Sequence, residues 1–159
     1  MRKGLLLTLA LTACTAVMPP YATAQTAAQA GAGLGVYDLA LARVAAEKVL
    51  STTKKILALN PSQDHATINS FTRYINIKEE QAQLVKIELL LLWVEYFKPK
   101  HLADYPDLHD TIWNAAKLCS AVQVEVSLEK AEDLMNTVEK IHNIYWDTKG
   151  RDVPFIRSR

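Results

Sequence analysis

The spacing of hydrophobic residues along the chain predicts three long helices. From about residue 38 to residue 59, apolar positions recur at alternating steps of three and four residues, which places them on one face of a helix. Asp38 stands where a carboxylate can accept hydrogen bonds from the first turn, and Pro61 follows the end of the segment. The apolar face is rich in alanine, so we expect this helix to lie close to a neighbour.

The second predicted helix, from about residue 67 to residue 98, has the clearest periodicity in the chain. Its apolar row is interrupted only by Lys78, and it ends before Pro99. Residues 84–97 are apolar around most of the circumference, which is typical of a helix at the centre of a bundle or in an interface.

The third helical region runs from about residue 104 to residue 149 and contains two apolar stripes that are rotated relative to each other. We expect Asp104 and Asp107 to cap its start and Gly150 to end it. The stripes meet at residues 121–128, AVQVEVSL. Apolar and polar residues alternate strictly in this segment, which is typical of a strand. No second strand is visible to pair with this segment, so we interpret it as a bend within one long helix.

Together these segments predict an all-α fold, an antiparallel bundle of three long helices. The short connections favour antiparallel neighbours, and a third region that folds back would add a fourth, short helix. The predicted domain covers residues 37–149. It follows a flexible leader of small residues at 25–36 and precedes a basic tail at 150–159.

The first 24 residues have the layout of a bacterial secretory signal peptide. Arg2 and Lys3 form a positive start, residues 5–11 are apolar, and small residues at 22–24 suit a signal peptidase. This pattern predicts a periplasmic or secreted protein that is cleaved after Ala24.

Cys14 gives an alternative reading of the same segment. Leu11, Thr12 and Ala13 precede it in a way that fits a lipoprotein cleavage box, in which Cys14 becomes the lipidated first residue. We favour cleavage after Ala24, and the alternative is a protein anchored to a membrane through this lipid.

Charge and cysteine content narrow the classes of function. Removal of the first 24 of 159 residues leaves 135 residues, with 16 basic and 17 acidic side chains. This balance argues against a nucleic-acid partner.

Only Cys119 remains as a cysteine, so a disulfide-stabilised fold is not expected. No segment after residue 24 has the roughly 20 apolar residues of a membrane span.

The densest group of potential metal ligands is a short acidic segment with two histidines: His101, Asp104, Asp107, His109 and Asp110. These residues could offer nitrogen and oxygen donors near a helix start. Their spacing matches no repeated ligand motif, so we interpret the aspartates as helix caps and assign no metal ligand and no cofactor.

A carrier of haem, a metal or another small ligand is the alternative function. Non-covalent haem would need an axial pair such as His142 with Met135 or His65, because the chain has no C-x-x-C-H attachment motif. Such a carrier predicts a cavity lined by residues 89–97 and the last apolar stripe.

The main prediction is a non-catalytic protein that binds another envelope protein. Cys119 has no partner base nearby in the sequence, and no catalytic motif stands out. The partner could be a secretion or conjugation apparatus, with this chain as an accessory subunit, or a toxin that it inhibits; a homo-oligomer is also compatible. Aromatic residues are typical of interface hot spots, and those chosen for contact are Trp93, Tyr96, Phe97, Tyr105 and Trp113.

Overall fold

The computed structural model describes residues 37–59 and 64–158. All regular secondary structure in these ranges is helical, which confirms the all-α prediction. The elements, in chain order, are α2 (Ala40–Ala58), α3 (His65–Leu91), the π-helix η1 (Leu92–Tyr96), α4 (Pro99–Asp104), α5 (Leu108–Val124) and α6 (Leu128–Thr148).

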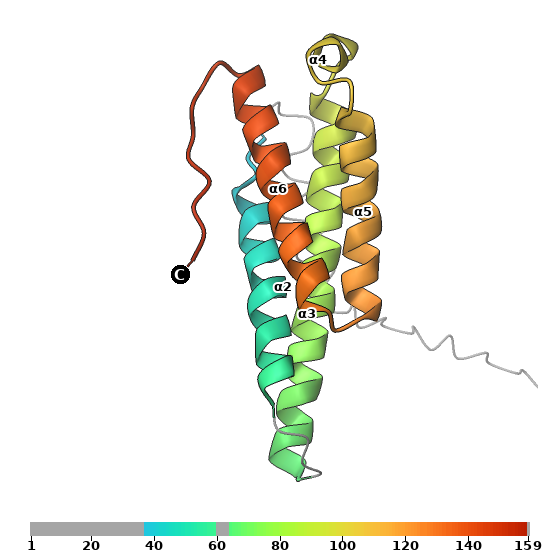
Figure 1. Cartoon of the computed structure of the whole chain (residues 1–159), viewed down its shortest axis with the longest axis vertical. Coiled ribbons are helices and arrows are strands. Elements are labelled where there is room, and N and C mark those ends of the chain that lie inside the picture. Colours follow the sequence, from blue (N-terminus) through green and yellow to red (C-terminus); the bar gives the residue numbers. More distant parts are fainter. Residues whose placement is uncertain (1–36, 60–63, 159) are drawn as a thin grey trace, which may run out of the picture.

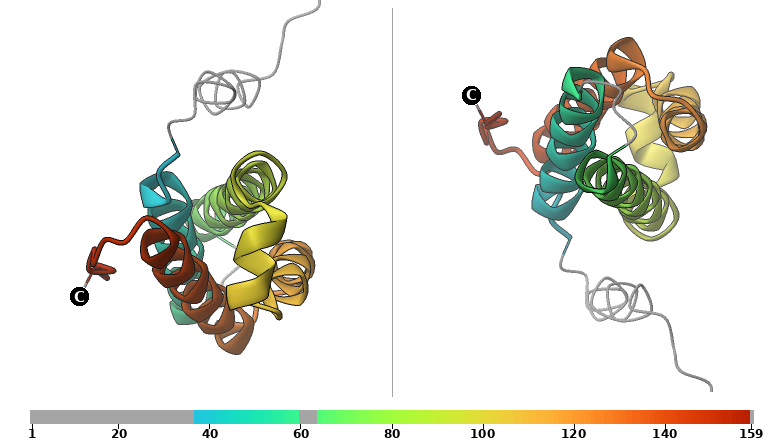
Figure 2. Two further views of the ribbon diagram at one scale, coloured as in Figure 1. Left: turned by 90° about the horizontal axis from the view of Figure 1, so that it is seen from above. Right: turned by 90° about the horizontal axis from the view of Figure 1, so that it is seen from below.

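Four long helices run alternately up and down to form an antiparallel bundle (Figure 1). Helix α2 packs against α3 and α6, and α5 also packs against α3 and α6. The four helices therefore surround one core. The short helix α4 lies across one end of the bundle, close to the ends of α3 and α5 (Figure 2).

The core is built from the apolar faces that the sequence periodicity predicts. Fully buried positions come from all four long helices, and the largest apolar side chains among them are Tyr145, Leu89, Leu108, Ile112, Leu134, Met135 and Ile141. Helix α2 contributes mainly alanines, Ala42, Ala45 and Ala46, which let its backbone lie close to its neighbours. Burial of each larger apolar side chain stabilises the fold by about 1.5–3 kcal/mol.

The prediction of one long third helix is wrong. Helix α5 ends at Val124, the backbone of Glu125 is extended, and α6 begins at Leu128 in the opposite direction. The fourth helix has 21 residues, so it is not the short one that was expected. The segment AVQVEVSL therefore contains the end of one helix and a turn, rather than a strand or a bend.

A buried lysine on α3 binds the carbonyl groups at the end of α5. Lys78 on α3 is 1% exposed, and its ammonium group donates hydrogen bonds to the carbonyl oxygens of Val122, Gln123 (2.9 Å) and Glu125 (3.2 Å). The last turn of a helix has carbonyl groups without partners within the helix. Lys78 supplies those partners from the neighbouring helix.

Several helix ends also differ from the predicted caps. Asp104 is the last residue of α4 rather than the first of a long helix. Asp107 precedes α5 but caps no N–H group with its side chain; instead it forms an ion pair with Lys140 at 2.6 Å. Asp38 does accept a hydrogen bond from the N–H of Ala40, as its position suggested.

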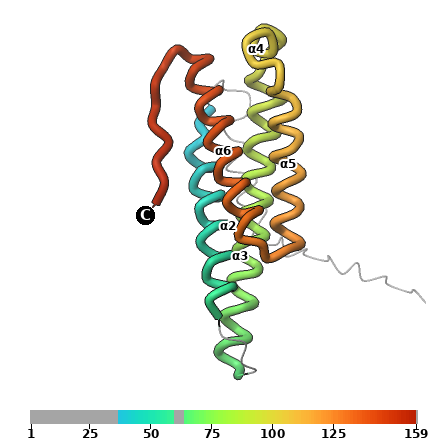
Figure 3. Tube along the Cα trace, in the orientation of Figure 1, coloured from blue at the N-terminus to red at the C-terminus, as the bar shows by residue number. Residues whose placement is uncertain are grey.

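The C-terminal segment turns back at Gly150, whose φ of 64° suits a glycine, and runs beside α6 and α2 (Figure 3). The guanidinium of Arg157 binds Glu139 on α6, and Arg43 on α2 donates to the carbonyl of Ile156 at 3.0 Å. Among the residues that the structure describes, no helix has the length and apolar character needed to cross a membrane.

Candidate functional site: a tyrosine cluster at one end of the bundle

Three tyrosines meet where α2 begins and where η1 and α6 end. The ring of Tyr96 lies 5.8 Å from that of Tyr37 and 4.8 Å from that of Tyr145, measured between ring centres. Tyr96 is the last residue of η1, Tyr37 precedes α2, and Tyr145 lies in the last turns of α6. We call Tyr37, Tyr96 and Tyr145 the tyrosine cluster.

Hydrogen bonds hold each hydroxyl of the cluster in place. Tyr37 donates to Glu95 at 2.9 Å, and Tyr145 donates to the main-chain carbonyl of Tyr37. The hydroxyl of Tyr96 is hydrogen-bonded to that of Thr148 at 2.7 Å. The polar ends of these rings thus have fixed partners although the rings themselves pack together.

The π-helix accounts for the position of Tyr96. Helix α3 widens at Leu92–Tyr96, and the N–H of Phe97 donates to the carbonyl of Leu92 at 3.2 Å. A π-turn inserts an additional residue into a helix and is often found at functional sites. Here the wider turn brings Tyr96 and Phe97 to the end of the bundle, with their ring centres 5.2 Å apart.

His101 borders the cluster from α4. Its ring stacks on Tyr96 at 5.5 Å, and its Nδ1 accepts a hydrogen bond from the N–H of Lys98 at 3.1 Å. Burial lowers the pKa of His101, and the positive charge of Lys100 lowers it further, while Asp104 acts in the opposite direction. The ring is therefore neutral at physiological pH and accepts at Nδ1.

One ammonium group lies over the cluster. The Nζ atom of Lys149 lies 4.6 Å from the ring centre of Tyr96 and 5.5 Å from that of Tyr145, within the range of cation–π attraction. Burial, with a smaller contribution from Tyr96, raises the pKa of Tyr145 to about 12. Tyr145 therefore remains a hydrogen-bond donor at neutral pH.

A surface recess lies beside the cluster, lined by Lys100, His101, Asp104, Tyr105, Asp147 and Thr148. In it the hydroxyl of Tyr105 donates to Asp147, and this hydrogen bond raises the pKa of Tyr105 to about 12. The recess thus combines an imidazole, two carboxylates and a phenol next to the tyrosine cluster.

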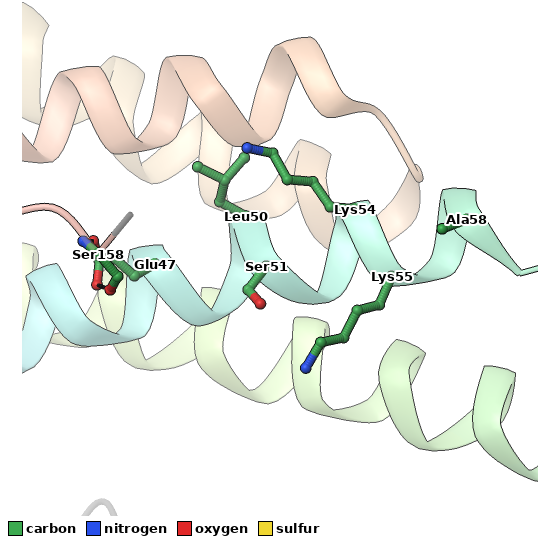
Figure 4. Close-up of a pocket in the computed structure, with 7 residues that line it drawn as sticks. All are labelled: Glu47, Leu50, Ser51, Lys54, Lys55, Ala58 and Ser158. Atoms are coloured by element: carbon green, nitrogen blue, oxygen red, sulfur yellow. Dashed lines mark hydrogen bonds between the residues drawn. The ribbon is translucent and has the colours of Figure 1, made fainter.

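A second recess, along α2, has less potential for chemistry. It is lined by Glu47, Leu50, Ser51, Lys54, Lys55, Ala58 and Ser158 (Figure 4). The side chains of Lys54 and Lys55 point to different sides of α2, and Glu47 is bound by Ser158 of the C-terminal segment. We therefore place the candidate site at the tyrosine cluster.

Four of the five aromatic residues chosen from the sequence lie near this end of the bundle. Trp93, Tyr96, Phe97 and Tyr105 are only partly exposed and pack against the core. Trp113 is different: its side chain is 57% exposed, and the ammonium of Lys117 lies 5.1 Å from its ring. Four of the five residues thus contribute to packing rather than to a free contact surface; Cys14 lies outside the described residues.

The sequence reading missed Tyr37, Tyr145 and His101 as members of one group. Tyr145 lies at the end of the second apolar stripe of the predicted third region, and Tyr37 directly precedes the first predicted helix. Their proximity depends on three chain reversals that bring the end of α6 beside the start of α2. Periodicity within single helices carries no signal for such a contact.

Solved structures with a similar bundle include superoxide dismutases. A nickel superoxide dismutase in its native state, solved at 1.30 Å, superposes with a TM-score of 0.65 and 33% sequence identity, covering 74% of this chain and 96% of that one. A variant of such an enzyme with a tyrosine replaced by phenylalanine gives a TM-score of 0.67 and 32% identity, covering 75% and 97%. The bundle therefore has the fold of a metal-containing oxidoreductase.

Sequence comparison gives the family. The family described as "Nickel-containing superoxide dismutase" matches residues 24–149. Superoxide dismutase [Ni] of Streptomyces seoulensis is 36% identical over 117 residues, which cover 72% of this chain and 83% of that protein; the enzyme of Streptomyces coelicolor is 33% identical with the same coverage. The chain belongs to the nickel-containing superoxide dismutase family.

This membership overturns the functional prediction made from the sequence. A non-catalytic protein that binds an envelope partner was expected, whereas the family and both Streptomyces relatives are named as enzymes. The alternative of a haem or small-ligand carrier is wrong for the same reason. An apparatus or a toxin as partner, with the contact residues chosen for it, has no support from these relatives.

The family name implies nickel, and the side chains in the described part of the chain do not fit that metal. Proteins hold nickel through imidazole nitrogen or through a square-planar set of nitrogen and oxygen donors. Within residues 37–59 and 64–158, no three His, Cys, Asp or Glu side chains are grouped closely enough to hold a metal ion. The imidazole and carboxylates beside the tyrosine cluster thus do not make a metal site.

Proposed function

We propose that this chain acts on superoxide as an oxidoreductase. The observation that carries the proposal is the family match over residues 24–149, which includes all four long helices of the bundle. The relative from Streptomyces seoulensis is matched over 83% of its length, so the likeness covers most of a protein named for this activity.

The reaction of a dismutase sets the requirements for a site. Two superoxide ions and two protons become one dioxygen and one hydrogen peroxide, because one ion loses the electron that the other gains. The substrate is an anion and the reduced product needs protons. A suitable site therefore offers positive charge and hydrogen-bond donors.

The tyrosine cluster offers both. Lys149 places an ammonium group over Tyr96 and Tyr145, and the raised pKa of Tyr145 keeps that phenol protonated. Residues 24–36, with which the family match begins, join the bundle at Tyr37. We therefore propose that superoxide reacts at this end of the bundle.

The test is the decay of superoxide after pulse radiolysis, with protein isolated from its native source. We expect the decay rate to rise in proportion to protein concentration, well above the spontaneous rate. Decay no faster than in buffer would refute the proposal. The same assay tests the location of the site through Tyr96→Phe, which removes a hydroxyl bound to Thr148.

A hydrogen bond of this kind contributes about 0.5–1.5 kcal/mol, so we expect Tyr96→Phe to lower the rate about tenfold or less. Trp113→Phe is the matched control, because Trp113 lies exposed on α5 with its ring beside Lys117. Equal rates for both variants and the unmodified protein would place the reaction elsewhere.

We also propose that the chain is exported. The family match begins at residue 24, beside the predicted cleavage after Ala24, which supports a leader that precedes the matched domain. The mass of the protein from its native source tests this. A first residue of Gln25 supports the proposal, a lipidated Cys14 supports the anchored alternative, and an intact residue 1 contradicts both.

A further inference from the structure

The family match begins with a stretch that contains no metal-binding side chain. Residues 24–36 consist only of Ala, Gln, Thr, Gly, Leu and Val. Solved structures of relatives include forms in which a histidine, an aspartate or a tyrosine near the start of the chain was replaced, and others that differ in nickel ligation. Of those three residue types, residues 24–37 contain only a tyrosine, Tyr37.

Thiolate donors are also missing from the matched region. Cys119 is its only cysteine; it is 0% exposed in the core, and burial raises the pKa of its thiol to about 12. Metals bind the thiolate rather than the thiol. Cys14, the other cysteine of the sequence, precedes the family match and lies in the segment predicted to be removed.

Three of the four histidines in the described part of the chain have hydrogen-bond partners within the bundle. The Nδ1 atom of His101 accepts from the N–H of Lys98, and that of His109 accepts from the indole of Trp93 at 2.8 Å. His142 is buried on α6, where its Nε2 is hydrogen-bonded to the carbonyl of Val153 at 2.9 Å. His65 is the first residue of α3, far along the chain from the other three.

We infer that the side chains of this chain do not form the nickel site that the family name implies. Any nickel in the native protein is then held by donors that this chain does not supply, such as a second protein or a small ligand. The inference rests on the proposed function for its need of a metal. The lack of nickel ligands is independent of the proposed function, because it follows from the sequence and from the positions of the side chains in the bundle.

Nickel binding tests the inference directly. The 159-residue sequence is expressed, the processed protein is freed of metal, and it is dialysed against nickel and then against nickel-free buffer. The nickel retained per chain is measured by mass spectrometry, with the Streptomyces seoulensis enzyme as positive control. We expect far less than one nickel per chain, unchanged in Cys119→Ala and His101→Gln.

One nickel retained per chain would overturn the inference, and its loss in one of the two variants would identify the ligand that was misjudged. This result leaves the proposed function intact. Conversely, native protein that fails to accelerate superoxide decay overturns the proposed function, while an absence of retained nickel still supports the inference. The two failures are thus distinguishable.

Discussion

Replacement of Lys78 by methionine tests the account of how the fourth helix arises. Methionine keeps the length of the buried stem and removes the ammonium group, so three carbonyl oxygens at the end of α5 lose their donor. Lys78 is 1% exposed, which limits the water available to replace it.

The change in the free energy of unfolding in Lys78→Met follows from two opposing effects. Hydrogen bonds from a charged donor contribute about 1.5–3 kcal/mol each, whereas removal of a buried charge recovers part of its desolvation cost. We expect Lys78→Met to lower the free energy of unfolding by about 2–4 kcal/mol. For a domain of this size the melting temperature then falls by roughly 5–15 °C.

The assay is urea unfolding followed by circular dichroism, with Lys86→Met as the matched control. Lys86 also lies on α3 and donates to α5, but it is only half-buried and binds the hydroxyl of Ser120 at 2.8 Å. We expect the control to lose about 1 kcal/mol or less. A Lys78→Met protein within about 0.5 kcal/mol of the unmodified one would refute the reasoning, because surface substitutions commonly have effects of that size.

Three further predictions concern single side chains. Burial raises the pKa of Glu88, so the native state binds a proton more readily than the unfolded chain, and the free energy of unfolding falls as pH rises above 4.5. Glu88→Gln should remove this fall when urea unfolding is measured across pH. An unchanged pH profile in the variant would contradict the prediction. Cys119 should resist a thiol reagent in native protein and react in denaturant, whereas fast native labelling would contradict its burial. Trp113→Ala should change the free energy of unfolding by about 1 kcal/mol or less, since the ring is exposed beside Lys117; a larger loss in urea unfolding would show a packing role.

The sequence predicted the helical segments because each one has an apolar face of its own. The periodicity of residues 67–98 predicted the core helix α3, and the apolar stripes before and after residues 121–128 indicated the helical segments that form α5 and α6. The carbonyl groups at the end of α5, where the two helices separate, are bound by Lys78 of α3. Lys78 was visible as the only polar residue in an apolar row, but its partners lie 44–47 positions away and depend on the packing of the bundle.

The site was predicted less well than the fold. Trp93, Tyr96, Phe97 and Tyr105 were selected as aromatic residues, and these four of the chosen five lie near the end of the bundle that carries the tyrosine cluster. They were interpreted as a contact surface because aromatic residues are common in interfaces, as they are in cores. The family could not be inferred from donor chemistry, since residues 24–36 carry no ligand pattern that would indicate a metal.

A graft tests the central claim, that this chain has the family fold without the donors for nickel. Residues 24–36 are replaced by the corresponding start of the Streptomyces seoulensis enzyme, and the nickel retained per chain is measured beside that of the unmodified protein. The account predicts one nickel per chain in the graft and far less in the unmodified protein. Equal nickel in both proteins would contradict it.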